Sequence, residues 1–427
     1  MATAEPVAVS RDAPFYMRPG TLQLQALPPL ALYIHLPWCL KKCPYCDFNS
    51  HEFKPLERQA AAIAATPIPS GLSGTAQLPE RQYVDALMAD LEGALPLIWG
   101  RPVHSVFLGG GTPSLFSPQA IDELLAGVRA RVRLAPDCEI TLEANPGTFE
   151  RDRFRAFRQA GVTRLSIGVQ SFDDRFLQAL GRVHDAAQAR AAVEEAALAF
   201  DTFNIDLMYA LPGQTLADLQ QDLKTTLAFK PPHVSIYHLT LEPNTYFAKF
   251  PPTLPDDDLA SDMLDTIVAS AGAAGLHRYE VSAFARDGHR CAHNLNYWQF
   301  GDYLGIGAGA HSKLSFAHRV HRQVRFREPQ LYMKNALGGQ AVTQDHEIAR
   351  ADLPFEYMLN ALRLKSGFAL TQFTERTGLP LTVLQQALEA AQQKGLIERD
   401  FAQVRPTPRG FDFLNDLQAL FLPAAPA

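Results

Sequence analysis

The sequence has few cysteines and lacks long apolar runs. None of its uninterrupted apolar stretches reaches the length that a membrane-spanning helix needs. The first twenty residues lack the apolar core of a secretory signal peptide, and we expect a flexible leader over residues 1–30. The five cysteines are odd in number, which argues against a disulfide scaffold and favours a reducing, cytoplasmic setting. The absences thus disfavour membrane-spanning and disulfide-rich secreted proteins.

The chain also has fewer basic than acidic residues. The chain has 39 Lys and Arg residues against 45 Asp and Glu residues, a net charge of −6. A broad nucleic-acid-binding surface requires clustered basic side chains, so we expect no nucleic-acid partner. The hydrophobic fraction of 47% and the length of 427 residues are those of an ordinary globular protein with two or three domains.

Strand-like and helix-like segments alternate through the first half of the chain. An apolar segment over residues 31–36 precedes helical periodicity over residues 83–95, and the next strand-like segment runs into three glycines at residues 109–111. About six such units follow one another, which implies parallel strands with right-handed crossovers. Six units are fewer than the eight of a closed barrel. The predicted fold class is therefore α/β, a partial (β/α)6 barrel.

Changes in sequence character suggest the domain boundaries. We place the barrel core at residues 31–280, with a surface insertion at about 55–82, and an extension that completes the core at 281–350. Residues 351–427 carry amphipathic helical patterns and a hairpin-like segment, which predict a small helical domain of winged-helix appearance. Winged helices often bind DNA, but the acidic chain gives that function little support.

Several polar, cysteine and glycine residues fall at predicted strand ends. In parallel α/β folds the chemistry gathers at the carboxyl ends of the strands. We therefore expect one shared site rather than separate ones. The residues at these ends are Cys39, Gly109 to Gly111, Glu143, Gln170, Asp206 and Tyr237.

Three of the five cysteines stand in one short segment, CLKKCPYCDF, as Cys39, Cys43 and Cys46. Structural zinc prefers four ligands, so a zinc site would need His35 or a distant residue as the fourth. A [4Fe–4S] cluster held by three thiolates would leave one iron without a protein ligand, open to a substrate or cofactor. The residues alone leave both chemistries open.

The cysteine segment resembles the cluster loop of radical S-adenosylmethionine (SAM) enzymes. The resemblance implies that Cys39, Cys43 and Cys46 hold a [4Fe–4S] cluster and that its fourth iron binds the amino and carboxylate groups of SAM. An aromatic residue commonly precedes the third cysteine in that superfamily, as Tyr45 does here. The candidate SAM-binding residues are Tyr33, Tyr45, Gly110, Gly111, Thr112, Glu143, Gln170, Arg182 and Asp206.

A narrower resemblance extends from Tyr33 to the C-terminal domain. The segments YIHLPWC, GGGTPS, LEANPG, SIGVQSF, LGRVH and NIDLMYALPG, in this order, resemble the oxygen-independent coproporphyrinogen III oxidase family. The oxidases themselves carry a further cysteine two residues after the third, where this chain has Phe48. That departure is typical of a branch of the family made up of heme chaperones.

A second motif, HNxxYW, resembles one that marks the same branch, and the resemblance implies that its residues are candidates for heme binding. These are His293, Asn294, Tyr297 and Trp298, with His311 as a second candidate ligand and Cys291 as a third. A neutral imidazole is a good axial ligand for heme iron, and the aromatic rings offer flat apolar surface to a macrocycle. Alternatively, His293 is a hydrogen-bonded loop residue and Trp298 belongs to the core.

Three functions remain open on this basis. The first is a chaperone that binds heme and passes it to an apo-hemoprotein, perhaps a respiratory one; the resemblance also implies a homodimer. On this interpretation no catalytic residue is assigned. The second is oxidative decarboxylation of two propionates of coproporphyrinogen III. The third is a winged-helix regulator with a structural metal, which would leave the barrel unexplained.

Overall fold

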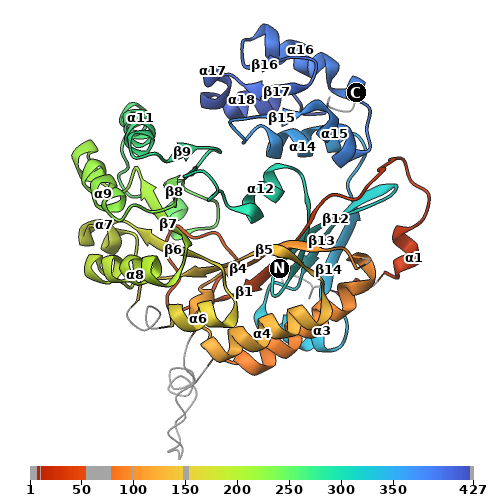
Figure 1. Cartoon of the computed structure of the whole chain (residues 1–427), viewed down its shortest axis with the longest axis horizontal. Helices are drawn as coiled ribbons and strands as arrows, with labels where there is room; N and C mark the ends of the chain where they lie inside the picture. The colour runs from red at the N-terminus through yellow and green to blue at the C-terminus, as the bar shows by residue number, and fades with distance from the viewer. Residues whose placement is uncertain (1–6, 10, 54–77, 99, 148–152, 424–427) are drawn as a thin grey trace, which may run out of the picture.

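Six parallel strands form the centre of the protein in a computed structural model, which describes residues 7–9, 11–53, 78–98, 100–147 and 153–423. They follow one another in sequence order across the sheet, as right-handed βαβ units require (Figure 1). The six strands are β1 (Leu30–Leu36), β4 (Val103–Gly110), β5 (Leu134–Ala144), β6 (Arg164–Gln170), β7 (Thr202–Tyr209) and β8 (His233–His238). The α/β parallel fold expected from the sequence is confirmed.

The parallel strands are apolar because helices cover the sheet. Six of the seven residues of β1 are buried, and Ile34 and Leu36 are fully inaccessible. The expected helix after Ser117 is present: the Ser117 side chain accepts a hydrogen bond from the Ala120 backbone N–H, with Pro118 in the first turn. The helices of the core are α3 (Glu80–Ile98), α4 (Pro118–Arg131), α6 (Phe154–Ala160), α7 (Asp174–Ala179), α8 (Ala186–Ala199), α9 (Leu216–Ala228), α10 (Tyr246–Lys249) and α11 (Asp257–Ala273).

The sheet continues beyond the six strands on both sides. Next to β8 lie β10 (Ala283–Ala285) and β9 (His277–Arg278), both antiparallel. On the other side β11 (Asp302–Ile306) pairs in parallel with β1, and β12 (His311–Phe316), β13 (Arg319–Arg325) and β14 (Val342–Glu347) follow as an antiparallel meander. Residues 281–350, predicted as an extension, therefore add strands on both sides of the six parallel strands: β10 next to β8, and β11 to β14 beyond β1. Helices α12 (Ala292–Trp298) and α13 (Pro329–Leu337) belong to the same segment.

Buried ion pairs fix the meander to the core. Arg325 on β13 lies 3.3 Å from the Asp90 carboxylate on α3, and the Tyr332 hydroxyl donates to the same carboxylate at 2.9 Å. Asp302 at the start of β11 pairs with Lys313 at 2.8 Å and with Arg101 at 2.9 Å. Removing one partner of a buried ion pair leaves the other charge buried without a partner, which lowers the free energy of unfolding by about 3–5 kcal/mol. These pairs therefore hold the strands from which His311 projects.

The helices of the C-terminal part of the chain begin at Leu353. Its sheet has the antiparallel order β15 (Phe368–Ala369), β17 (Gln403–Pro406), β16 (Ile397–Arg399), and β16 and β17 form the hairpin expected from the sequence. In Figure 1 this domain lies beside the core sheet, with α12 between the two. The helices of the domain are α14 (Leu353–Ala361), α15 (Leu370–Thr377), α16 (Gln385–Gln393), α17 (Pro408–Asp412) and α18 (Leu414–Ala419).

The described part of the N-terminal segment is packed, which differs from the flexible leader expected from the sequence. Helix α1 (Ala13–Tyr16) buries Tyr16 against the meander, and Leu22 and Leu24 join the apolar core of the C-terminal domain. These scattered apolar residues find partners some 300 positions away, which local sequence does not reveal. Most of the predicted insertion lies outside the described residues. No helix in the described ranges is both long and apolar enough to cross a membrane.

Candidate functional site

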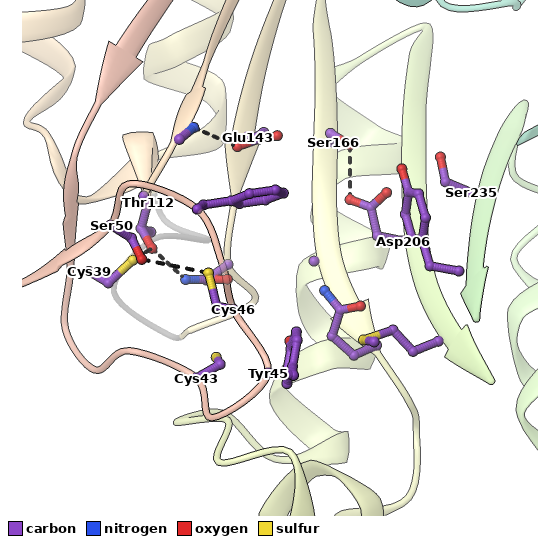
Figure 2. A pocket seen from close by; sticks show the side chains of 18 of the residues that line it. Cys39, Cys43, Tyr45, Cys46, Ser50, Thr112, Glu143, Ser166, Asp206 and Ser235 are labelled. Carbon is purple, nitrogen blue, oxygen red and sulfur yellow. Dashed lines mark hydrogen bonds between the residues drawn. The ribbon is translucent and has the colours of Figure 1, made fainter. Parts of the chain in front are cut away.

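A cavity of about 630 Å³ opens at the carboxyl ends of the parallel strands, and it is called the first cavity below. The strand-end residues expected to share a site do so, apart from Gly109, which does not reach the lining. In Figure 2 the cysteine loop lies on one side, with Asp206 and Ser235 on the opposite side. The predicted residues that line it are Tyr33, Cys39, Cys43, Tyr45, Cys46, Gly110, Gly111, Thr112, Glu143, Gln170, Arg182, Asp206, Tyr237, His293, Asn294 and Tyr297.

The three cysteines follow β1 and the short strand β2 (Trp38–Cys39), which pairs with β3 (His51–Glu52). Thr112 Oγ1 donates a hydrogen bond to Cys39 Sγ at 3.4 Å, and Arg182 Nη1 donates one to Cys43 Sγ at 3.6 Å. Burial raises the pKa of the Cys39 thiol to about 11. A metal must therefore displace that proton, and the hydroxyl and guanidinium donors stabilise the resulting thiolates.

A single-metal site is not supported by the geometry. No three His, Cys, Asp or Glu side chains among the described residues gather closely enough to hold one metal ion. The ring of His35 is engaged elsewhere: Nδ1 lies 2.9 Å from the Tyr33 hydroxyl, and Nε2 lies 3.0 Å from the Asn49 carbonyl. Burial lowers the pKa of His35 to about 4, so the ring is neutral. A cluster of several irons, which spreads its three ligands around a larger body, fits the loop better than zinc does.

The glycine loop at the end of β4 packs directly against the end of β1. Gly110 has a φ of +112°, and a Cβ at this position would collide with the His35 ring. A Cβ at Gly111 would collide with the backbone of residues 36–38. The glycines are thus required by the close approach of two strand ends. That approach places the loop backbone and Thr112 beside the cysteines.

Two partly buried carboxyl groups, those of Glu143 and Asp206, face the first cavity. Burial and the charge of Asp206 raise the pKa of Glu143 to about 8, although the Gly110 backbone N–H donates to its Oε2 at 3.1 Å. Burial also raises the pKa of Asp206, against hydrogen bonds from Asn204 at 2.7 Å and Ser166 at 3.0 Å. Buried carboxylates are stable only when they are paired. The pair therefore suits a ligand that carries an ammonium or sulfonium group.

Two further predicted residues have polar atoms without partners. Gln170 has a φ of +69°, a left-handed conformation that is rare for a residue other than glycine, and within the described chain its buried Oε1 accepts no hydrogen bond. Arg182 donates to Asn145 Oδ1 at 2.6 Å and to the Gly168 carbonyl at 2.7 Å, but its buried Nε has no partner in the same ranges. Gln170 Oε1 and Arg182 Nε can therefore form hydrogen bonds with a ligand in the cavity.

The HNxxYW motif forms α12 and divides between two environments. His293 is 1% exposed; its Nδ1 lies 3.0 Å from Ser105 Oγ on β4, and its Nε2 lies 3.1 Å from the Tyr297 hydroxyl. Trp298 does not line the cavity: the Arg363 guanidinium from the C-terminal domain stacks over its ring at 4.2 Å. The geometry agrees with the alternative that His293 is a hydrogen-bonded structural residue, although it lies in a helix rather than a loop.

His311 lies apart from the first cavity. It is exposed at the start of β12 and lines an adjoining cavity of about 440 Å³, called the second cavity below. Cys291, the third candidate heme ligand, is buried at the N-terminus of α12 with its Sγ 3.5 Å from Glu139 Oε1. Neither residue therefore joins the cysteine site.

Sequence reasoning missed several residues of the first cavity. Asn204 lies two positions before Asp206 on β7, so both side chains face the same side, and Asn204 Oδ1 accepts from Ser235 at 3.0 Å on β8. The two-residue spacing was a usable signal for Asn204. Ser235 has the same two-residue spacing to Tyr237 on β8, whereas Ser166 and the exposed His238 carry no such signal, because single polar residues on strands are common.

The sequence matches the radical SAM superfamily over residues 33–226 and the HemN C-terminal domain over residues 348–413. The heme chaperone HemW of Escherichia coli is 44% identical over 400 residues, which cover 93% of this chain and 99% of the relative. The chain belongs to the HemW family of radical SAM proteins.

More distant relatives agree with this assignment. The HemW of Mycobacterium tuberculosis H37Rv is 36% identical, covering 85% of this chain and 88% of the relative. The mouse mitochondrial protein named radical S-adenosyl methionine domain-containing protein 1 is 36% identical, covering 92% of this chain and 87% of the relative. The solved coproporphyrinogen III oxidase HemN of E. coli shares the fold, with a TM-score of 0.74 at 23% identity over 92% of this chain and 90% of that one. Membership of the radical SAM superfamily implies a [4Fe–4S] cluster and SAM, and the first cavity fits both.

Proposed function

We propose that the protein is a heme chaperone, which binds heme and transfers it to an apo-hemoprotein. The proposal extends to a [4Fe–4S] cluster and SAM in the first cavity. Its support is the high identity to HemW proteins along nearly the whole chain, together with the chemistry of the two cavities. A location in the cytoplasm, an acceptor in respiration and a homodimer belong to the same proposal and rest on likeness alone.

We assign the cluster to the three thiolates of the loop and SAM to the rest of the first cavity. The cluster, when bound, supplies electrons and one iron that is open to a further ligand. Arg182 offsets the negative charge of the thiolates through its bond to Cys43 Sγ. Glu143 and Asp206 compensate the positive groups of SAM, while Gln170 Oε1 accepts a hydrogen bond. Tyr33, Tyr45, Gly110, Gly111 and Thr112 form the surrounding wall.

The observation that favours a chaperone over a decarboxylase is Phe48. Its side chain is 60% exposed and lines both cavities. A phenyl ring can neither transfer a proton nor bind a metal, so the thiol that the resemblance places here in coproporphyrinogen oxidases has no substitute at this position. An exposed ring beside a cavity instead offers a flat apolar surface to a macrocycle.

The experiment compares the two functions in one preparation. The cluster is reconstituted anaerobically, heme binding is followed by absorbance, and transfer is followed with apomyoglobin as the acceptor. A second portion is incubated with coproporphyrinogen III, SAM and a reductant. We expect stoichiometric heme binding, transfer to apomyoglobin and no protoporphyrinogen IX. Formation of protoporphyrinogen IX would replace the chaperone with the oxidative decarboxylase.

A further inference from the structure

The second cavity adjoins the first; its lining includes Glu143 but neither the three thiols nor Asp206. Asn49 closes one side of it: the Asn49 amide donates to the carbonyls of Ala308 at 2.9 Å and Arg327 at 2.8 Å, which joins the cysteine loop to the meander. The cavity therefore exists only because two segments more than 250 residues apart dock together. The residues that line it are Tyr33, His35, Asp47, Phe48, Asn49, Gly110, Glu143, Tyr297, Tyr303, Gly309, His311 and Arg327.

Four aromatic side chains, those of Tyr33, Phe48, Tyr297 and Tyr303, contribute to the walls of the second cavity. Tyr297 and Tyr303 pack edge to face with centroids 4.6 Å apart, and the exposed ring of Phe48 lies at the border with the first cavity. At about 440 Å³ the space is of the size that holds small organic ligands. These walls suit a flat, mainly apolar molecule.

Acidic and basic side chains lie in different parts of the second cavity. Asp47 and Glu143 lie in the part shared with the first cavity, whereas Arg327 is exposed in the part that belongs to the second cavity alone. Arg322 is already engaged by the Tyr303 hydroxyl and the Glu356 carboxylate, but no carboxylate pairs with Arg327 in the described chain. An acidic group on a ligand can therefore bind at Arg327.

His311 is the imidazole of this cavity that is free to bind a metal. It is exposed, and neither ring nitrogen has a hydrogen-bond partner among the described residues, in contrast to both nitrogens of His35 and of His293. Partial burial and the cationic Arg322 and Arg327 lower the pKa of His311, so the ring is neutral near pH 7. A neutral imidazole with a free nitrogen is what iron in a macrocycle requires.

We propose that heme binds in the second cavity, with His311 as its axial ligand, a propionate at Arg327 and the macrocycle against Phe48 and Tyr297. The inference rests on the proposed function and assigns its location. His293 then acts as a positioning residue, because its hydrogen bond at 3.1 Å holds the Tyr297 hydroxyl and hence the ring. Bound in this way, heme borders the cluster site without entering it.

The test replaces the ligand and then restores it chemically. In the full-length, cluster-reconstituted protein, His311→Gly should change the Soret band and the iron spin state and weaken heme binding at least tenfold, about the loss seen even for outer partners of metal ligands. Free imidazole added to the variant should restore the wild-type spectrum. The matched control is His346→Gly, an exposed histidine on β14 outside both cavities, which should leave the spectrum unchanged.

The second arm tests the acidic edge of the ligand. Wild type should bind heme about two- to fivefold more tightly than heme dimethyl ester, the range of an exposed ion pair, and Arg327→Ala should bind both alike. An unchanged heme spectrum in His311→Gly would overturn the proposed location of heme while leaving the chaperone function in place. Loss of the Soret band in His238→Ala or His293→Gln, in place of His311→Gly, would do the same. Failure of wild type to bind heme would reject the function itself.

Discussion

The first cavity is lined by three thiols, two carboxyls and a guanidinium that are partly buried and mostly have partners within the protein. The second cavity instead presents exposed His311, Arg327 and Phe48. Groups that hold one another in position suit a resident cofactor, because little reorganisation is needed when it binds. Exposed groups with few partners suit a cargo that must also leave. On our proposal, the difference separates the site of the resident cofactors from the site of the heme that is delivered.

The wall between the cavities is as informative as their interiors. Tyr33 and Tyr297 line both, and the hydroxyl of each is bonded to a buried, neutral histidine, His35 or His293. Burial lowers the pKa of His293 to about 3, so this ring stays uncharged at neutral pH. The HNxxYW motif thus shapes a boundary, and on our proposal it acts on heme through Tyr297 rather than through the iron.

The largest expected effect that separates the two cavities is the loss of the cluster when one of its cysteine ligands is replaced. Replacing Cys43 by Ala should remove most of the iron and sulfide from the reconstituted protein, because a cluster with two protein ligands is not retained. Cys138→Ala, at a half-buried cysteine that lines neither cavity, is the control and should keep full iron content. Heme affinity of the Cys43 variant should stay close to wild type. Loss of heme binding together with the cluster would show that the cavities are not independent.

The next effect concerns SAM. Asp206→Asn should weaken SAM binding to the cluster-loaded protein by about 10- to 100-fold, the loss of one charge-assisted interaction of about 1.5–3 kcal/mol. Iron content should be unchanged, since Asp206 bonds to Asn204 and Ser166 rather than to the cysteine loop. Titration of the reduced cluster with SAM, followed by electron paramagnetic resonance, measures the affinity. His311→Gly is the matched control, and equal weakening in both variants would count against separate sites.

The strand-end part of the site could be predicted from the sequence because its order follows from local patterns. Each βα unit places its last residues at one edge of a parallel sheet, so Glu143, Gln170 and Asp206 had to meet. The spacing of the cysteines limited their chemistry without any knowledge of contacts. The alternation of segments was therefore sufficient for the α/β core and for the strand-end residues of the first cavity, but not for its other lining residues such as Asn204 and Ser166.

The second cavity could not be predicted, because it arises from long-range docking. His311 was a candidate by residue type, but its neighbours Phe48 and Arg327 come from segments that no local pattern connects. The partner of His293, Ser105, lies 188 positions away on β4, and Trp298 faces the C-terminal domain because Arg363 stacks over it. His293 and Trp298, two positions of the HNxxYW motif, thus lie in different environments.

The smallest expected effect is a proton linkage that should exist in the first cavity alone. The free-state pKa of Glu143 is raised from 4.5 to about 8 by burial and by the charge of Asp206, so the carboxyl is mostly protonated at pH 7. The positive groups of SAM favour the carboxylate and lower that pKa, so binding releases a proton. Affinity should therefore rise with pH, by up to about tenfold per unit between pH 6 and 7.5, and level off as pH approaches 8.

Calorimetry in two buffers of different ionisation enthalpy measures this release directly. At pH 7 wild type should release close to one proton per SAM bound, and Glu143→Gln should release almost none while keeping the shape of the side chain. Heme binding to the second cavity should show no comparable release, because His311 is already neutral there. If Glu143→Gln released as many protons as wild type, Glu143 would not be the group that faces the positive charge. If heme binding released protons as SAM binding does, the carboxyl groups of the first cavity would contact both ligands. The two ligands would then not have separate sites, and the contrast between a resident cofactor and a mobile cargo would be wrong.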